Sequence, residues 1–263
     1  PVPAGHPEAE TAAGAGRRRG LMASGPVGQR SALPYQILAG VEPVSGGWLV
    51  APGNLQGITL APQPAYVLGS LAEVLDYRPS FSVVALHAPV GTQEKPNDER
   101  SCDTTARGLL GRRRAAIVRA PSKALLEATS FEEAQEIDPS VDIVRWRSLA
   151  KAAESIREVQ SWRQRTVWEV SPELTFKQMN DGNDLTYGRR TMLGRQERIE
   201  LLTRKLPGAE RVLKERPKGV REDKLIDALS DLWTARRIMA HAISRAADPP
   251  VWDEEGVRMD IVY

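Results

Sequence analysis

The sequence predicts an α/β fold, a mixed five-stranded sheet flanked by helices, with a helical insertion between the fourth and fifth strands. Residues 83–86 read Val-Val-Ala-Leu and are followed by Pro89 and Gly91, a pattern typical of a strand buried on both faces. Three strand-like segments with Gly, Pro and Asn turns precede this run. Segments with apolar residues at helical spacing follow it, so strands and helices share one sheet-centred domain.

Composition limits the class of protein. With 263 residues, 41% of them hydrophobic, the chain is long enough for one sizeable globular domain or one domain with an insertion. A net charge of +2 is too small to indicate a nucleic-acid partner without further evidence. The single cysteine, Cys102, excludes an internal disulfide framework and fits a reducing, cytoplasmic environment. No run approaches about 18 apolar residues, so no membrane span is predicted.

The first half of the chain predicts a tail followed by four strands. Residues 1–34 are rich in Ala, Gly, Pro and Arg without apolar periodicity, which predicts a disordered tail. A single domain is then expected over residues 35–263. Its first three strands, expected over 36–41, 48–51 and 56–61, form an antiparallel meander. A short helix over 69–77 follows, and a crossover then leads to the buried strand over 81–87.

The second half predicts an insertion, a fifth strand and a helical end. The insertion covers about residues 92–165, with helices expected over 98–110, 122–128, 131–137 and 142–163. The fifth strand is expected over 166–170, and helices over 172–179, 191–205 and 221–247, with an edge strand over 257–262. The insertion is large enough to form a lid or a docking surface. A protein partner or a homo-oligomer therefore stays an open alternative.

The candidate site lies at the carboxyl ends of the strands. Ligands in open α/β sheets bind there, and His87 follows the buried strand. Glu42 closes the first strand, and Glu169 ends the fifth. Asp223 and Asp227 are spaced i and i+4 on the last helix and share one face. Carboxylates that converge from these elements are what a two-magnesium site that hydrolyses phosphodiesters needs.

Each acid also has a structural interpretation. Asp223 lies near a helix N-terminus, where the helix dipole favours an acid. Asp231, one turn beyond Asp227, is expected on a solvated face, and Glu42 beside Pro43 is compatible with a surface position. Asp227 differs because it lies inside the apolar pattern of residues 225–229. A carboxylate there needs a partner or a metal ion.

Two groups of arginines are candidates for nucleic-acid binding. The residues are Arg107, Arg112, Arg113 and Arg114 in the insertion, and Arg189, Arg190 and Arg195 before and within the predicted helix 191–205. Guanidinium groups suit phosphate contacts. The alternatives are a solvated loop or ion pairs with acids of the insertion for the first group, and ion pairs with the site carboxylates for the second.

The ordered motifs resemble the domain of unknown function 429 family. They include Gly-Val-Glu-Pro at 40–43, Leu-His-Ala-Pro-Val-Gly at 86–91, Trp-Glu-Val-Ser-Pro-Glu at 168–173 and Glu-Asp-Lys-Leu-Ile-Asp-Ala at 222–228. Further matching segments lie at 44–51, 100–107, 111–114, 194–198 and 256–263. The resemblance extends in order from about residue 36 to the C-terminus. It implies a predicted nuclease with a ribonuclease-H-like fold.

The chain departs from that family pattern at the candidate site. The pattern has Asp where this chain has Glu42 and Asp where it has His87, and the position of Ser171 is commonly His. A neutral imidazole binds Mn²⁺ or Zn²⁺ more readily than Mg²⁺. Glu169, Asp223 and Asp227 match the pattern.

Three hypotheses follow. In the first, the protein is a metal-dependent nuclease in which Glu42, His87 and Asp227 hold the metal, with Glu169 or Asp223 as a supporting ligand or base. In the second, it is a catalytically degenerate ribonuclease-H-like protein that binds nucleic acid or protein. In the third, it is an interaction subunit of a larger assembly.

Overall fold

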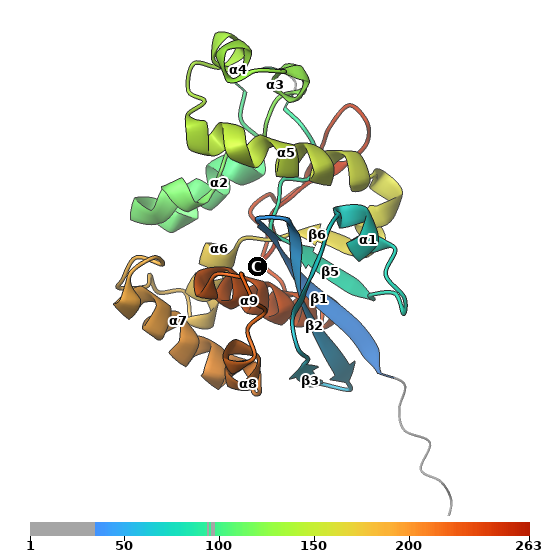
Figure 1. Cartoon of the computed structure of the whole chain (residues 1–263), viewed down its shortest axis with the longest axis vertical. Coiled ribbons are helices and arrows are strands. Elements are labelled where there is room, and N and C mark those ends of the chain that lie inside the picture. The colour runs from blue at the N-terminus through green and yellow to red at the C-terminus, as the bar shows by residue number, and fades with distance from the viewer. Residues whose placement is uncertain (1–34, 94, 96–97) are drawn as a thin grey trace, which may run out of the picture. The chain divides into compact units, whose positions relative to one another are not determined.

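The computed structural model describes residues 35–93, 95 and 98–263 of the chain. The predicted tail, residues 1–34, lies outside this range. The order of elements begins with β1 (Gln36–Val44), β2 (Gly47–Gln56), β3 (Thr59–Pro62) and β4 (Tyr66–Leu68), followed by α1 (Leu71–Leu75) and β5 (Val83–Leu86). Most of the later elements are helical, as Figure 1 shows.

The main sheet is mixed and has six strands. Its order is β3-β2-β1-β5-β6, with β4 paired to β2. β1 runs antiparallel to β2 and parallel to β5, and β5 runs parallel to β6 (Val167–Glu169). The predicted count of five strands was wrong because β4 has only three residues, too few to show alternation between Pro64 and Gly69.

β2 also differs from its predicted extent. Its predicted end at Pro52 and Gly53 lies inside the strand, and the chain turns at Gly57 instead, where φ is +59°. Gly53 faces packed side chains, since a Cβ atom added there would lie 2.8 Å from Leu60 Cδ1. The glycine signal at 53 therefore reflects close packing and not a turn.

β5 is the central strand that the sequence predicts. All four of its residues are buried. Val83 and Ala85 face the core that contains α9 (Glu222–Met239), whereas Val84 and Leu86 face the core that contains α1. The strand is therefore covered on both faces, as its uninterrupted apolar run indicates.

The chain between β5 and β6 is helical. It contains α2 (Ser101–Leu110), η1 (Gly111–Ala116), α3 (Lys123–Glu127), α4 (Phe131–Ile137), α5 (Ile143–Glu158) and η2 (Ser161–Arg165). α2 packs on a core that includes Leu174 and Ile261, whereas α3 and α4 meet α5 around the buried Leu125, Ala134 and Val141. In Figure 1 α3, α4 and α5 lie together beyond one end of the sheet.

The last third of the chain covers one face of the sheet. It contains α6 (Pro172–Met179), α7 (Met192–Lys205), α8 (Ala209–Lys214) and α9, and then the two-stranded ribbon of β7 (Val251–Trp252) and β8 (Arg258–Met259). The predicted last strand, 257–262, thus pairs mainly with β7; only Val262 reaches the main sheet end, through a parallel bridge to Val170. Within the described part of the chain, none of the helices combines the length and apolar character needed to cross a membrane.

Candidate metal centre

The site begins where two parallel strands end side by side. Val41 of β1 pairs with Leu86 of β5, so Glu42 and His87 are the next residue on each strand. The His87 amide donates to the carbonyl oxygen of Val41 at 2.9 Å, which extends the pairing to the site. Glu42 is fully buried, and the His87 side chain is 24% exposed. The sequence prediction that Glu42 and His87 converge at this edge is consistent with this geometry.

α9 brings a third set of polar groups to the same edge. Lys224, Asp227 and Asp231 are spaced i, i+3 and i+7, so they share the helix face that meets the sheet. The helix lies directly on β1, because a Cβ atom at Gly40 would be 2.1 Å from the carbonyl oxygen of Ala228. Gly40 and Glu42 share a face of β1. The close approach at Gly40 therefore places the polar side chains of α9 beside Glu42.

Both carboxylate oxygens of Glu42 have a partner. Oε1 is paired with His87 Nδ1 in a very short contact, and Oε2 accepts a hydrogen bond from Lys224 Nζ at 2.8 Å. Burial alone raises the pKa of Glu42, but the charges and hydrogen bonds of His87 and Lys224 outweigh it and lower the pKa to about 2. Glu42 is therefore a carboxylate at neutral pH.

Asp231 has no such partners. Its side chain is fully buried, and neither carboxylate oxygen has a hydrogen-bond partner among the described residues. Burial, the negative charges of Glu42 and Asp227, and a hydrogen bond that the protonated acid would share with Glu42 raise the pKa of Asp231 well above its usual value. The expectation of a solvated Asp231 was wrong. A buried carboxylate without a partner is energetically costly and indicates a missing cation or proton.

Asp227 is buried like Asp231 but lies beside one cation. It is 2% exposed, and its Oδ2 atom lies 3.2 Å from Arg189 Nη1. Burial and the charge of Glu42 raise the pKa of Asp227 to about 7, although Arg189 opposes the shift. Asp227 therefore has an arginine as an ion-pair partner, although its Oδ2 atom accepts no hydrogen bond among the described residues.

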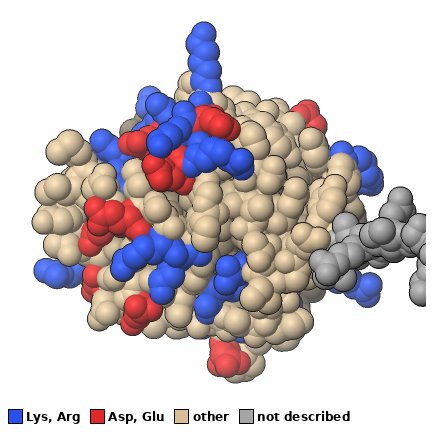
Figure 2. All heavy atoms as spheres, turned by 90° about the horizontal axis from the view of Figure 1, so that it is seen from below, with Lys and Arg blue, Asp and Glu red and all other residues tan. Residues whose placement is uncertain are grey.

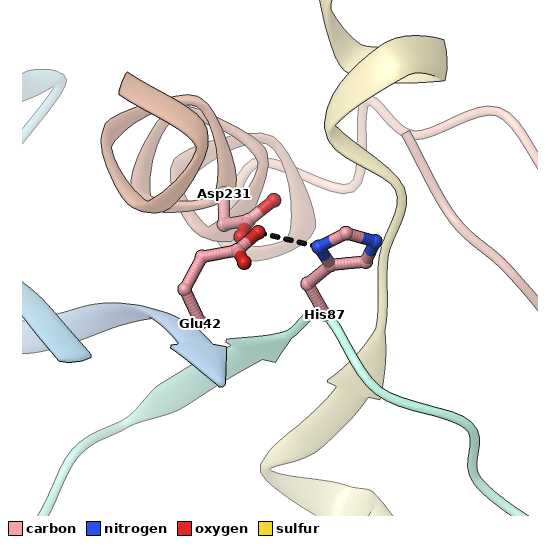
Figure 3. Close-up of side chains that lie close together, drawn as sticks. All are labelled: Glu42, His87 and Asp231. Atoms are coloured by element: carbon pink, nitrogen blue, oxygen red, sulfur yellow. Dashed lines mark hydrogen bonds and ion pairs between the residues drawn. The ribbon is translucent and has the colours of Figure 1, made fainter. Parts of the chain in front are cut away.

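Glu42, His87 and Asp231 form a group that could hold a metal ion. One potential ligand atom from each lies within 4.8 Å of those of the other two. Figure 3 shows the Glu42 and Asp231 carboxylates close together, with the His87 ring turned toward them. Two carboxylates and an imidazole suit Mn²⁺ or Zn²⁺ better than a set of oxygen ligands alone would. These three residues come from β1, the end of β5 and α9.

Three of the predicted ligands, Asp227, Glu169 and Asp223, lie outside this group. Glu169 accepts two hydrogen bonds from Arg100, at 2.7 and 2.8 Å, and a third from the amide of Val90 at 2.7 Å. Asp223, at the start of α9, is paired with Arg221 at 2.6 Å. Both carboxylates thus already have cationic partners, and the structure does not bring them to the Glu42, His87 and Asp231 group.

Several of the predicted nucleic-acid-binding arginines are engaged in other contacts. Arg107 contacts Glu99 and donates to the carbonyl oxygen of Ile117, Arg113 donates to the carbonyl oxygens of Leu185 and Tyr187, and Arg195 pairs with Glu222 at 3.0 Å. Arg112 and Arg114 are exposed on η1. Arg190 is exposed and Arg189 half-buried, and both line the cavity at the site.

A cavity of about 1300 Å³ separates the insertion from this edge of the sheet. His87, Lys224 and Glu169 lie on the sheet side, and parts of η1 and α5 form the opposite wall. Three further cations line the cavity from separate elements, and their side chains contact no partner in the described chain: Arg147 of α5, Arg190 before α7 and Lys218 before α9.

The sequence signals for Asp231 and Lys224 were present but not decisive. Asp231 follows Asp227 by one turn and lies between Leu229 and Leu232, both buried, so it belongs to the packed face of α9. Lys224 lies three residues before Asp227 on the same face. The packing of α9 against Gly40 decides which polar residues of the helix face the sheet, and this packing identifies Lys224 and Asp231 as site residues.

Comparison with known proteins supports a family assignment. The model of the family described as "Protein of unknown function (DUF429)" matches residues 40–251. Neither the curated proteins nor the solved structures gave a significant match to the chain. The match includes β1, β5, β6 and α9, which carry the candidate metal centre. The chain therefore belongs to the DUF429 family.

Proposed function

We propose that this protein is a divalent-metal-dependent hydrolase that cleaves phosphodiester bonds in nucleic acid. The observation that carries the proposal is Asp231, a fully buried carboxylate with two unpartnered oxygens beside Glu42 and His87. A divalent ion would satisfy those oxygens and would favour the ionised form of the acid, which burial disfavours. The donor set fits Mn²⁺, and Mg²⁺ is the alternative that the carboxylates favour.

The arrangement of the sheet supports a ribonuclease-H-like interpretation of the fold. Three antiparallel strands, β1 to β3, are followed by β5 and β6, which run parallel to β1. The candidate ligands lie at the carboxyl end of this parallel part and on the helix that packs on it.

The side chains around the centre have distinct roles in this proposal. A bound divalent ion would supply Lewis-acid activation of water and of the phosphate group. Glu42, His87 and Asp231 would hold it. Lys224 and Arg189 line the cavity while Glu42 and Asp227 hold them in place, so they present fixed positive charge to a phosphate. Glu169 is bonded to Arg100 through both oxygens and stabilises the edge of the sheet.

The cavity supports an extended polyanion as the substrate. Arg147, Arg190 and Lys218 approach it from three elements without a partner in the described chain. Acidic and basic residues are interspersed on the face seen in Figure 2. Their concentration around the site favours a ligand with several phosphates, as in a nucleic-acid backbone.

Calorimetric titration with Mn²⁺ and Mg²⁺ tests the metal centre. We expect saturable binding by the wild-type protein and at least a tenfold loss of affinity in Asp231→Asn. Asp223→Asn is the matched control, because it makes the same change on the same helix outside the group. Cleavage of labelled RNA and DNA in the preferred metal then tests the activity. A wild-type protein that binds neither ion would contradict the proposal.

A second candidate function is supported by Glu42. Both of its oxygens already have partners within the chain, which is the arrangement expected if a site has replaced its metal with side chains. In this case the protein would bind nucleic acid without hydrolysing it. Salt-sensitive binding of labelled RNA or DNA together with no metal binding would favour this alternative.

A further inference from the structure

We propose that Lys224 takes the place of a second metal ion, so that the centre accepts one divalent ion per chain instead of two. The inference rests on the proposed metal centre. Lys224 Nζ lies 2.8 Å from Glu42 Oε2, whereas His87 contacts the other oxygen, Oε1. The ammonium group therefore occupies the carboxylate oxygen that a second ion would need as a ligand.

Two-metal centres depend on shared carboxylates. Two ions about 3.5–4 Å apart are held in part by oxygens of a common acid, and each ion needs its own open coordination. Glu42 is the buried acid between His87 and α9. Since Lys224 occupies Oε2, an ion beside His87 and Asp231 could use only Oε1, the oxygen that contacts His87 Nδ1 in the metal-free site.

The charge of the site supports the same conclusion. Glu42, Asp227 and Asp231 supply three carboxylates, and Lys224 and Arg189 are two fixed cations in contact with two of them. With all three acids ionised the group has an excess of one negative charge, and one divalent ion changes this to an excess of one positive charge. A second ion would leave three uncompensated positive charges in a largely buried site, which is unfavourable.

Lys224 also reaches the cavity beside the candidate centre. The side chain is 23% exposed and lines the cavity together with His87. Lys224 therefore faces the space in which a phosphate group would lie beside the bound ion.

The test compares metal stoichiometry in Lys224→Met and the wild type. Titration calorimetry with Mn²⁺ gives the number of ions, and electron paramagnetic resonance distinguishes an isolated ion from a coupled pair. We expect one ion in the wild type and two, spin-coupled, in Lys224→Met. Lys224→Arg should keep one ion because it keeps the charge. Lys218→Met is the matched control, since Lys218 lines the same cavity without a carboxylate partner.

The outcomes separate this inference from the proposed function. Two ions in the wild type, or one ion in both the wild type and Lys224→Met, would overturn the role of Lys224 and leave the metal centre intact. No ion in the wild type but one in Lys224→Met would refute the metal-dependent function and support Lys224 as a built-in cation. No ion in either protein would overturn both. If Lys224→Met does not fold, Lys224→Gln replaces it in the same comparison.

Discussion

The buried acids of this protein form two groups that differ in their partners. Glu169 and Glu173 lie at the end of β6 and the start of α6, and each is bonded to a buried arginine, Arg100 or Arg198. Asp231, which is equally buried, has no hydrogen-bond partner among the described residues. Burial of an acid therefore does not identify a binding site in this protein. The absence of a partner inside the chain is the more informative property.

The first group has an arrangement expected of structural ion pairs. Arg100 is 4% exposed and donates to both oxygens of Glu169, to both oxygens of Asp103 and to the carbonyl oxygen of Val90. One guanidinium thus ties the ends of β5 and β6 to α2. Such fully paired charges hold the edge of the sheet in position. Asp231, in contrast, has no hydrogen-bond partner among the described residues.

The largest predicted effect tests the first group. Arg100→Ala leaves Glu169 and Asp103 buried without their cation, and we expect it to lower the free energy of unfolding by about 3–5 kcal/mol. Asp231→Asn replaces a buried acid that has no hydrogen-bond partner among the described residues with a neutral amide of similar shape, so the metal-free protein should be unchanged or stabilised. Urea denaturation of both variants in the presence of a chelator measures the difference. Comparable losses of stability in the two variants would contradict the distinction between the paired acids and the unpaired Asp231.

The sequence predicted more of the sheet than of its ends. The all-apolar run of β5 was sufficient to identify a central strand, and α6 was predicted with its observed bounds because Pro172 marks its first turn. α9 ends at Met239 and not at 247, since His241 has a φ of +52° and the Ala242 amide bonds to the carbonyl oxygen of Arg237. A left-handed residue other than glycine gives little sequence signal.

The candidate site was predicted only in part, because pairing depends on the tertiary structure. Strand ends placed Glu42 and His87 correctly beside each other, and local pattern marked Asp227 as buried. Glu169 looked equally suitable, but Arg100 contacts it from 69 residues away in the chain. Asp231 was missed because its i+4 relation to Asp227 is also typical of a solvated stripe. Only the contact of α9 with Gly40 distinguishes these two cases.

A pH titration sharpens the comparison at Asp227, which lies one turn before Asp231 on α9. The folded-state pKa of Asp227 is about 7, above its usual 3.8, so the folded protein retains a proton that the unfolded chain has lost between these values. Stability should therefore fall as pH rises from about 4 to about 7 and then level off. Relative to Asp227→Asn, the metal-free wild type should lose about 2–4 kcal/mol over this range.

Urea denaturation at several pH values measures this loss. Glu42 acts in the opposite direction, because its folded-state pKa of about 2 lies below the usual 4.5. Its contribution is present above pH 4.5 and is lost as pH falls toward 2, outside the range in which Asp227 acts. Parallel stability curves for the wild type and Asp227→Asn would show that Arg189 keeps Asp227 ionised, and would move it into the group of fully paired acids.

The smallest predicted effect extends the comparison to the arginines. Arg147 lines the cavity without a partner in the described chain, in contrast to Arg100. Arg147→Ala should change stability by less than about 0.5 kcal/mol, as is usual for an exposed side chain. It should weaken binding of labelled RNA or DNA severalfold and lower the dependence of log Kd on log salt concentration by about 0.7–0.9, the value for one lost phosphate contact. Lys214→Ala on α8 is the control, because Lys214 is 73% exposed and pairs only with Glu210. An equal loss of binding in both variants would mean that overall positive charge, and not the cavity, attracts the ligand.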